Sequence, residues 1–368
     1  MKSIKNLLCT MRNTRYGSDI LDLYSRHYPR FKFLGCKIKL KFNILKPEAV
    51  YWLTTYDCNF HCNHCEASAG EKKVSELSTN EICDVFTELS EMGIKKIFIT
   101  GGEPLVRKDT FKVIRHILDL GMGYGIASNG YLVEKFKEEF REMKPYMYFT
   151  SIDGLEKTND KIRGMKGAFR KSFEALEFFK SIGVGARFIN TVVVPENIEE
   201  LQELKKIIII SAANFWRFAI PIPVGRSKDN EKTILNKEQI KYLFDFIEET
   251  NKEFDVELTE DAGYLGGMSL KLRSRSFFCG AGLTRCTIMP DGEVFGCQSP
   301  YDNMYSEGNI RNKSFKEIWK TGFSRFRNPQ CDKEECLTCE YFKSCRGGCW
   351  GMRLKEKHCY KDIWEEKH

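Results

Sequence analysis

The sequence predicts an α/β fold: a partial (β/α)6 TIM-type barrel followed by a C-terminal cysteine-rich module. Three observations predict it. Apolar runs typical of strands alternate six times with amphipathic runs typical of helices between residues 49 and 220, which requires a parallel sheet with right-handed crossovers. Six such units favour an open, partial barrel over the complete eight. Nine of the 15 cysteines then lie from Cys279 onward.

Apolar spacing and end signals define the elements of the barrel. The first helix begins at the capping box Ser78-x-x-Glu81 and ends at Gly93. The second begins at Asp109 and ends before Gly121. Further helices are expected over 131–143, 168–182 and 197–210. Strands are expected over 49–55, 96–100, 123–127, 146–152, 186–194 and 214–220.

Composition and pattern divide the chain into four segments. Residues 1–47 form a basic N-terminal arm, residues 48–222 the barrel, and residues 223–276 a bridging segment with a helix from about 236 to 251. Residues 277–368 form the cysteine-rich module, which contains a hairpin around the turn Pro290-Asp291-Gly292. A chain of 368 residues is long for one core, so a large domain with a smaller module is expected.

The net charge of +7 is concentrated in the arm, where eleven residues are Lys or Arg and two are acidic. The arm lacks the aromatic surfaces on which single-stranded nucleic acid stacks, so a nucleic acid partner is not expected. Two interpretations remain open. The arm could receive an acidic peptide, or it could be a solvated helical cap whose apolar side packs on the barrel through Ile4, Leu7, Leu8 and Met11.

The composition, 42% apolar and 30% charged, is typical of a globular protein. No apolar run approaches the roughly 20 residues that span a bilayer, and the amino terminus lacks the apolar segment of a secretory signal. Fifteen cysteines without such a signal predict metal ligation in a reducing compartment rather than disulfides. We therefore expect a cytoplasmic protein that does not contact membranes.

Three cysteines at the spacing C-x3-C-x2-C, namely Cys58, Cys62 and Cys65, follow the first predicted strand. A four-iron cluster held by three thiolates keeps one iron open, and that iron can bind a small molecule. The competing interpretation is a zinc site in which His61 or His64 supplies a fourth ligand.

Polar and glycine-rich turns follow the next three predicted strands. They are Gly101-Gly102-Glu103-Pro104, Ser128-Asn129-Gly130 and Ser151-Ile152-Asp153-Gly154. Because chemistry in such barrels gathers where strands end and lead into helices, we expect these turns and the cysteines to face one mouth. Ordinary turn chemistry is the alternative reason for Asn-Gly and Asp-Gly pairs.

The cysteine triplet with the Gly-Gly-Glu-Pro turn resembles the radical S-adenosylmethionine (SAM) enzymes. The resemblance implies that a reduced [4Fe-4S] cluster on Cys58, Cys62 and Cys65 cleaves SAM to a 5'-deoxyadenosyl radical. It further implies that the Gly101–Pro104 turn holds the methionine amino group, through the glycine carbonyls and Glu103. Asn129 and Ser151 would contact the ribose and the methionine, and Asp153 a ribose or substrate hydroxyl.

The later cysteines resemble the seven-cysteine SPASM domain, in the order C-x12-G-x4-C, C-x2-C-x5-C-x3-C and a final C. The resemblance implies two auxiliary [4Fe-4S] clusters. The first would be held by Cys279, Cys286, Cys297 and Cys349, and the second by Cys336, Cys339, Cys345 and Cys359. Cys331 could replace Cys286 as a ligand. A zinc ribbon built from the same cysteines is the structural alternative.

SPASM relatives mostly modify peptides or proteins, so the resemblance implies a peptide or protein substrate, with or without a separate recognition protein, and an electron donor such as flavodoxin or ferredoxin. Gln298 stands where the sulfatase-maturing branch has an Asp that acts as a general base. Glutamine cannot accept a proton at neutral pH, which disfavours that activity. Tetrapyrrole side-chain modification is the alternative activity; Gly225-Arg226 resembles a stretch of that branch, although an exposed loop arginine would look the same. A zinc-stabilised binding protein is the alternative of another class.

Overall fold

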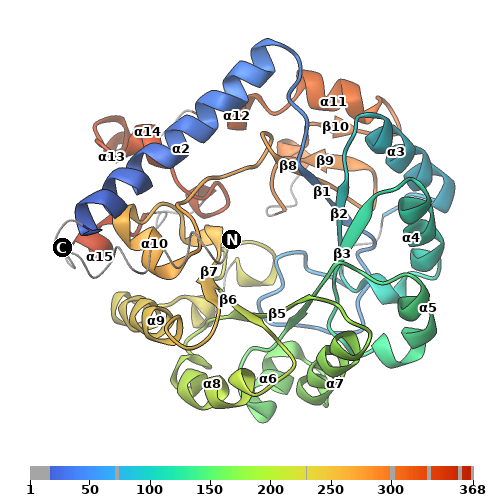
Figure 1. Cartoon of the computed structure of the whole chain (residues 1–368), viewed down its shortest axis with the longest axis horizontal. Coiled ribbons are helices and arrows are strands. Elements are labelled where there is room, and N and C mark those ends of the chain that lie inside the picture. Colours follow the sequence, from blue (N-terminus) through green and yellow to red (C-terminus); the bar gives the residue numbers. More distant parts are fainter. Residues whose placement is uncertain are drawn as a thin grey trace.

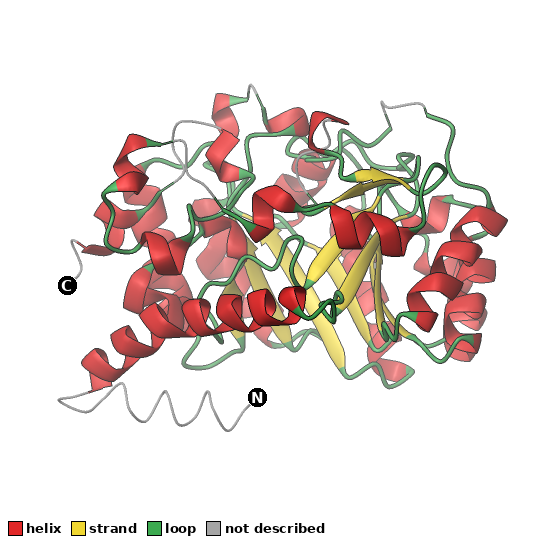
Figure 2. Ribbon diagram, turned by 90° about the horizontal axis from the view of Figure 1, so that it is seen from above, coloured by secondary structure: helices red, strands yellow, loops and turns green. Residues whose placement is uncertain are grey.

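The protein is described by a computed structural model that covers residues 17–70, 74–228, 230–298, 303–329, 333–354 and 359–365. A sheet of ten strands in the order β10-β9-β8-β1-β2-β3-β4-β5-β6-β7 forms its centre. Figure 1 shows these strands in an open arc with helices outside it, and Figure 2 shows the same layers from above. The predicted partial barrel is confirmed.

The six predicted strands are present and parallel to their neighbours. Their bounds are β1 Ala49–Leu53, β2 Lys96–Thr100, β3 Gly123–Ala127, β4 Met147–Ser151, β5 Ala186–Val192 and β6 Phe215–Ala219. The helices that follow them are α3 Thr79–Glu91, α4 Thr110–Asp119, α5 Lys137–Glu142, α6 Glu156–Arg163, α7 Ala168–Ser181, α8 Leu201–Ile209 and α9 Lys237–Thr250. The capping box of α3 forms as expected, because the Ser78 side chain accepts from the backbone N–H of Glu81.

Four further strands extend the sheet beyond the six of the predicted barrel. The bridging segment contributes β7 Val256–Leu258, which pairs with β6. The cysteine module contributes β8 Arg285–Ile288, which pairs in parallel with β1 on the other side. The predicted hairpin consists of β8 and the antiparallel β9 Glu293–Phe295, and β10 Gly308–Asn309 pairs with β9. The module therefore continues the barrel sheet.

Strand register places the interior side chains in layers. Phe149, Phe188 and Phe215 are in register on β4, β5 and β6 and stack with ring centroids 4.5 and 4.6 Å apart. Two residues farther along, where side chains return to the same face, a polar row crosses four strands. It consists of Ser151, Asn190, Arg217 and Glu257. An aromatic floor thus lies beneath a polar row at the carboxyl ends of the strands.

The arm forms a long helix, α2 Gly17–Lys41, which packs on the cysteine module and the bridging segment (Figure 1). Ser344 donates to the backbone carbonyl of Arg26 at 2.8 Å, and Arg30 donates to the Ser344 hydroxyl at 2.9 Å. The apolar residues Ile4, Leu7, Leu8 and Met11, which were expected to pack on the barrel, lie outside the described residues.

The remaining helices are short and belong to the bridging segment and the module. They are α10 Ser269–Leu272, α11 Phe315–Thr321, α12 Ser324–Arg327, α13 Glu334–Leu337, α14 Phe342–Cys345 and α15 Lys361–Glu365. Among the described helices, none combines the length and the apolar character that crossing a lipid bilayer requires.

Candidate active site

A cavity of about 290 Å³ opens at the carboxyl ends of the barrel strands and contains most of the predicted site. Its lining includes the predicted residues Cys58, Cys62, Cys65, Gly101, Gly102, Glu103, Asn129 and Ser151. Pro104 begins the short 3-10 helix Pro104–Val106 behind this wall. The expectation that the turns and the cysteines face one mouth is therefore correct for the lining residues, whereas Pro104 and Asp153 lie outside the lining.

The three clustered thiols suit an iron site. Burial raises the pKa of the Cys58 thiol to about 12 and also raises the pKa of Cys62. Without a nearby cation both thiols therefore keep their protons at neutral pH. A cationic cluster would stabilise the thiolates directly, because metal binding draws protons from its ligands.

Gly101 and Gly102 are required by the cysteine loop itself. A Cβ on Gly102 would lie 2.1 Å from the backbone oxygen of Asp57, and Gly101 has a φ of 147°. The N–H of Gly102 donates to the carbonyl of Thr55 at 2.8 Å, and that of Glu103 to the carbonyl of Asp57 at 2.9 Å. The two loops that build the site thus form one hydrogen-bonded unit.

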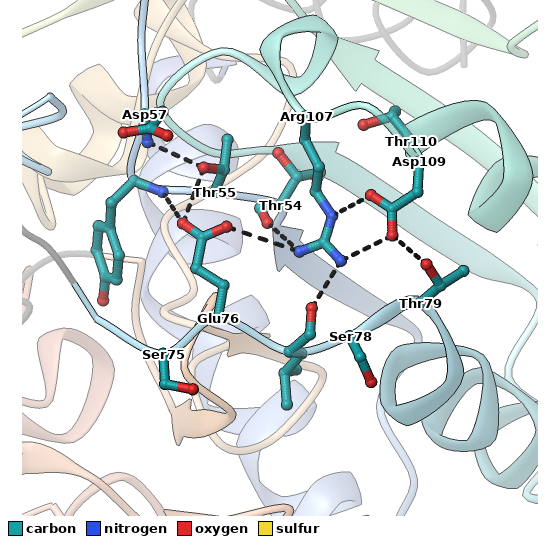
Figure 3. Close-up of polar contacts among 12 residues, drawn as sticks. Thr54, Thr55, Asp57, Ser75, Glu76, Ser78, Thr79, Arg107, Asp109 and Thr110 are labelled. Carbon is teal, nitrogen blue, oxygen red and sulfur yellow. Dashed lines mark hydrogen bonds and ion pairs between the residues drawn. The ribbon is translucent and has the colours of Figure 1, made fainter.

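Arg107 binds the backbone that leads into the cysteine loop (Figure 3). Its guanidinium donates to the backbone carbonyls of Thr54 at 2.9 Å and Leu77 at 2.7 Å, and to Asp109 at 2.7 and 3.0 Å. Glu76, 3.8 Å from the same guanidinium, accepts hydrogen bonds from the Thr55 hydroxyl and the Tyr56 N–H. No sequence signal marked Arg107, because its partners come from three separate segments.

Glu103 connects the second strand end to the third. One carboxylate oxygen accepts from the Leu105 N–H at 3.1 Å and the Ser128 hydroxyl at 2.9 Å, and the other accepts from the Asn129 N–H at 2.8 Å. Burial raises the pKa of Glu103 to about 7, although these hydrogen bonds oppose the rise. The carboxyl group therefore positions Asn129, whose side chain donates to Asn59 at 2.7 Å.

Asp153 lies behind the cavity wall, fully buried, and orients two residues that line it. Its carboxylate is 3.2 Å from the Arg163 guanidinium and 3.3 Å from Nε2 of His64, and it accepts from the Val192 N–H at 2.8 Å. Burial alone would raise the pKa of Asp153, but His64 and Arg163 hold it below its usual range. With both oxygens engaged, Asp153 is placed to position side chains; a direct contact with a ribose or substrate hydroxyl stays a prediction.

Arg163 and His64 bring a guanidinium and an imidazole to the cavity. The Arg163 guanidinium lies over the ring of Phe60 at 5.8 Å, and its Nε is buried without a hydrogen-bond partner in the part of the chain that the structure describes. Nδ1 of His64 is likewise buried and without a partner among the described residues. Both orphaned nitrogens indicate that a polar ligand completes this wall. His64, the candidate zinc ligand, thus faces Asp153 through Nε2.

Gly225 and Arg226 close the cysteine loop from the opposite side. Arg226 donates to the carbonyls of Cys62 at 2.7 Å and Ala69 at 3.0 Å. A Cβ on Gly225 would lie 2.3 Å from the backbone oxygen of Cys65. Arg226 therefore supports the cysteine loop from within the cavity wall and is not the exposed loop arginine considered above.

A larger cavity of about 460 Å³, here called the chamber, adjoins the first. Both cavities share Glu66, Ser151, Asn190, Val192 and Ala219 as lining. The chamber lies where the arc of strands is open, between β7 and β8, and an ion pair between Glu260 and Arg285 spans that opening. Gln298 and Trp350 of the module also line it.

The cysteines of the first predicted auxiliary set divide at Cys286. Cys279, Cys297 and Cys349 line the chamber, and burial raises the pKa of Cys349 well above its usual value, with further contributions from Cys297 and Cys279. Cys286 belongs to the hydrophobic core. Its neighbours Arg285 and Thr287 line the chamber, so strand alternation turns Cys286 to the opposite face. The structure therefore contradicts the placement of Cys286 with the other three.

The cysteines of the second predicted auxiliary set interact electrostatically. Burial raises the pKa of Cys345 to about 12, and Cys359, Cys336 and Cys339 raise it further through their negative charges. That these four thiols together bind a second cluster stays a prediction. Cys331, the proposed substitute for Cys286, lies outside the described residues.

Comparison with known proteins places this arrangement in a family. The model of the radical SAM superfamily matches residues 52–208, and the model of an iron-sulfur cluster-binding domain, SPASM, matches residues 279–347. An AdoMet-dependent heme synthase of Oleidesulfovibrio alaskensis is 30% identical over 82% of this chain and 81% of its own length. The mycofactocin maturase MftC of Mycolicibacterium smegmatis is 30% identical over 84% of this chain and 79% of its own.

A solved structure shows the same fold. The crystal structure of Streptococcus suis SuiB bound to S-adenosylmethionine superposes with a TM-score of 0.68 at 19% identity, covering 88% of this chain and 79% of SuiB. The two family models imply SAM and [4Fe-4S] clusters as cofactors. The chain belongs to the radical SAM superfamily, as an iron-sulfur enzyme with a C-terminal SPASM domain.

Proposed function

We propose that the enzyme modifies a peptide or protein substrate, in the manner of a peptide maturase. The position of the chamber carries the proposal, because the chamber joins the cofactor cavity on one side to Cys279, Cys297 and Cys349 on the other. A substrate there would lie between the site of hydrogen abstraction and a redox centre, as oxidation by successive one-electron steps requires. The similarity to a mycofactocin maturase supports the maturase type.

The roles of the chain's own residues follow from their positions. Cys58, Cys62 and Cys65 would hold the cluster that binds SAM, and the SPASM cysteines would hold the auxiliary clusters. When bound, SAM and the reduced cluster supply a 5'-deoxyadenosyl radical. Glu103 fixes Asn129 at the cavity wall, and Asp153 fixes Arg163 beside the cysteine loop. Flavodoxin or ferredoxin would supply the electron.

Modification of a tetrapyrrole side chain is the second candidate. The similarity to an AdoMet-dependent heme synthase, at the same 30% identity, favours it. The carboxylate side chains of a tetrapyrrole in the chamber would also lie near the arginines that line it. The two candidates differ in the substrate and share the cofactors.

The first test of function measures SAM cleavage in protein purified and reconstituted without oxygen. We expect about twelve irons per chain and 5'-deoxyadenosine under a strong reductant, with none from a variant carrying Cys58→Ala, Cys62→Ala and Cys65→Ala. Candidate peptides from short reading frames beside the gene, and coproporphyrin, are then offered separately, and products are identified by mass spectrometry. Zinc in place of iron, with no 5'-deoxyadenosine, would refute the enzyme; a changed tetrapyrrole with unchanged peptides would select the second candidate.

A further inference from the structure

The chamber contains a row of polar side chains that the cofactor site does not use. Asn190, Arg217 and Glu257 are in register on β5, β6 and β7 and all line the chamber. Arg217 and Glu257 do not line the cofactor cavity. The row begins at Ser151, which lines both cavities, so the barrel wall leads from the cofactor into the chamber as a continuous polar surface.

Two polar atoms on the chamber wall are buried and have no interaction partner among the described residues. They are Oδ1 of Asn190 on β5 and Oγ1 of Thr287 on β8. Nε of Arg217 on β6 is also buried without a hydrogen bond, but it lies 3.2 Å from Oε1 of Glu257 in an ion pair. Buried polar groups in native proteins are nearly always hydrogen-bonded, so the unpaired amide oxygen and hydroxyl indicate a polar ligand. An arginine nitrogen and a hydroxyl can donate to an anionic oxygen, and an amide oxygen can accept from an N–H.

The chamber lining contains four arginines and four carboxylates, so an anion would bind there through individual guanidinium groups and not through an excess of positive charge. Arg217 is 3.2 Å from Glu257, and its guanidinium lies 5.9 Å from the ring of Phe149 in the aromatic floor. At the opening of the arc, Glu260 is shared by Arg275 and Arg285, so two guanidinium groups face one carboxylate. Guanidinium groups bind carboxylates through paired, charge-assisted hydrogen bonds.

We propose that the chamber is the substrate site and that it binds the substrate by a carboxylate held on Arg217, with the Thr287 hydroxyl as a second donor. Asn190 then accepts a neighbouring N–H of the substrate. A carboxylate with an N–H beside it is the chemistry of a peptide, at its chain end or at an acidic residue. This inference rests on the proposed function, because it identifies the substrate of that same site.

The proposal is tested by binding, without turnover, on anaerobic protein loaded with clusters and SAM. The probes are acetyl-trialanine with a free carboxylate, the same peptide as its C-terminal amide, and coproporphyrin III. We expect the acid to bind at least about tenfold more tightly than the amide, as one charge-assisted contact in a desolvated site provides. Arg217→Gln removes that difference, and Arg217→Lys restores part of it through a single ammonium contact.

Matched variants separate the carboxylate contact from general damage. Glu257→Gln, which frees Arg217 from its partner, is expected to tighten binding of the acid. Arg115→Gln removes an arginine that is 57% exposed and paired with Glu142 at 2.9 Å far from the chamber, and it should leave both affinities unchanged. Iron content and thermal unfolding of each variant show whether it is folded.

Each outcome decides the proposal. A wild-type protein that does not distinguish the acid from the amide, including one that binds neither, would overturn it, as would a preference that survives Arg217→Gln in a folded variant. Tight binding of coproporphyrin III that depends on Arg217, without peptide binding, would overturn the peptide assignment and show that the bound carboxylate belongs to a tetrapyrrole. Failure of the proposed function is a separate result: no 5'-deoxyadenosine from wild-type protein, whatever the probes bind.

Discussion

Replacing Asp153 by Asn tests whether the buried ion pair behind the cavity holds the site together. Asp153 is fully buried, and its carboxylate faces the Arg163 guanidinium at 3.2 Å and His64 at 3.3 Å. The Asp153→Asn variant keeps the shape of the side chain but replaces the charged carboxylate by a neutral amide. The NH₂ group of that amide then faces groups that are themselves donors. Breaking a buried pair on one side typically costs about 3 to 5 kcal/mol, because a buried charge loses its partner.

The assay is urea unfolding of the anaerobic, cluster-loaded protein, followed by tryptophan fluorescence. Glu156→Gln provides the control, because it breaks a surface pair with Arg170 at 2.7 Å in which the side chains are 47% and 73% exposed. Surface pairs contribute about 0 to 1 kcal/mol. A loss of unfolding free energy in Asp153→Asn no larger than that of the control would refute the reasoning. It would mean that solvent or local rearrangement stabilises the Arg163 charge in place of the carboxylate.

Three further predictions use separate parts of the site. Cys286→Ala should keep the full iron content, whereas Cys349→Ala should lose iron; equal losses would return Cys286 to the ligand set. Gly102→Ala should lose about 1 to 3 kcal/mol of stability, as overpacking does, together with iron from the cofactor cavity, while Gly185→Ala, with open space around it, should lose neither. Burial raises the pKa of Glu103 to about 7, so its carboxyl group stays protonated to a higher pH in the folded state than in the unfolded state. The free energy of unfolding therefore falls as the pH rises from about 4.5 to 7. Urea midpoints from pH 5 to 8, without SAM, should show this slope in wild type and lack it in Glu103→Gln; parallel profiles would contradict it.

Local patterns in the sequence predicted the barrel well, because apolar periodicity and end signals act within a few residues. The helix over 236–251 is present as α9, and the capping box at Ser78 forms. In both cases the interacting residues are neighbours in the sequence. The grouping of Cys336, Cys339, Cys345 and Cys359 was implied by the resemblance to the SPASM domain, and it stays a prediction.

Pairings between distant segments were not predictable in the same way. The strand β7 has only three residues, too few to show an alternation. The pairing of β8 with β1 joins segments more than 230 residues apart, and it determines which way Cys286 faces. The helix α6, Glu156–Arg163, has few apolar residues, so its role in bringing Arg163 to Asp153 had no periodic signal.

Two turns have close neighbours that the sequence did not indicate. Gly101 and Gly102 were expected to hold the methionine amino group through their carbonyls, and the structure shows that they also admit the backbone of the cysteine loop. Asp153 was expected to contact a ribose or substrate hydroxyl, and the structure places it outside the cavity lining, beside Arg163 and His64. Both expected ligand contacts stay predictions. A turn motif indicates that space is needed, but only the packed neighbours show what fills it.

The pairing of β8 with β1 makes the two halves of this enzyme inseparable. The strand that leads into Cys58, Cys62 and Cys65 takes one of its two hydrogen-bonded neighbours from the SPASM domain. A protein cut before residue 277 would leave β1 as a bare sheet edge, open to aggregation and free to shift the loop that follows it. A foreign cysteine module fused to this barrel would therefore need a strand that pairs with β1, in addition to its cluster ligands.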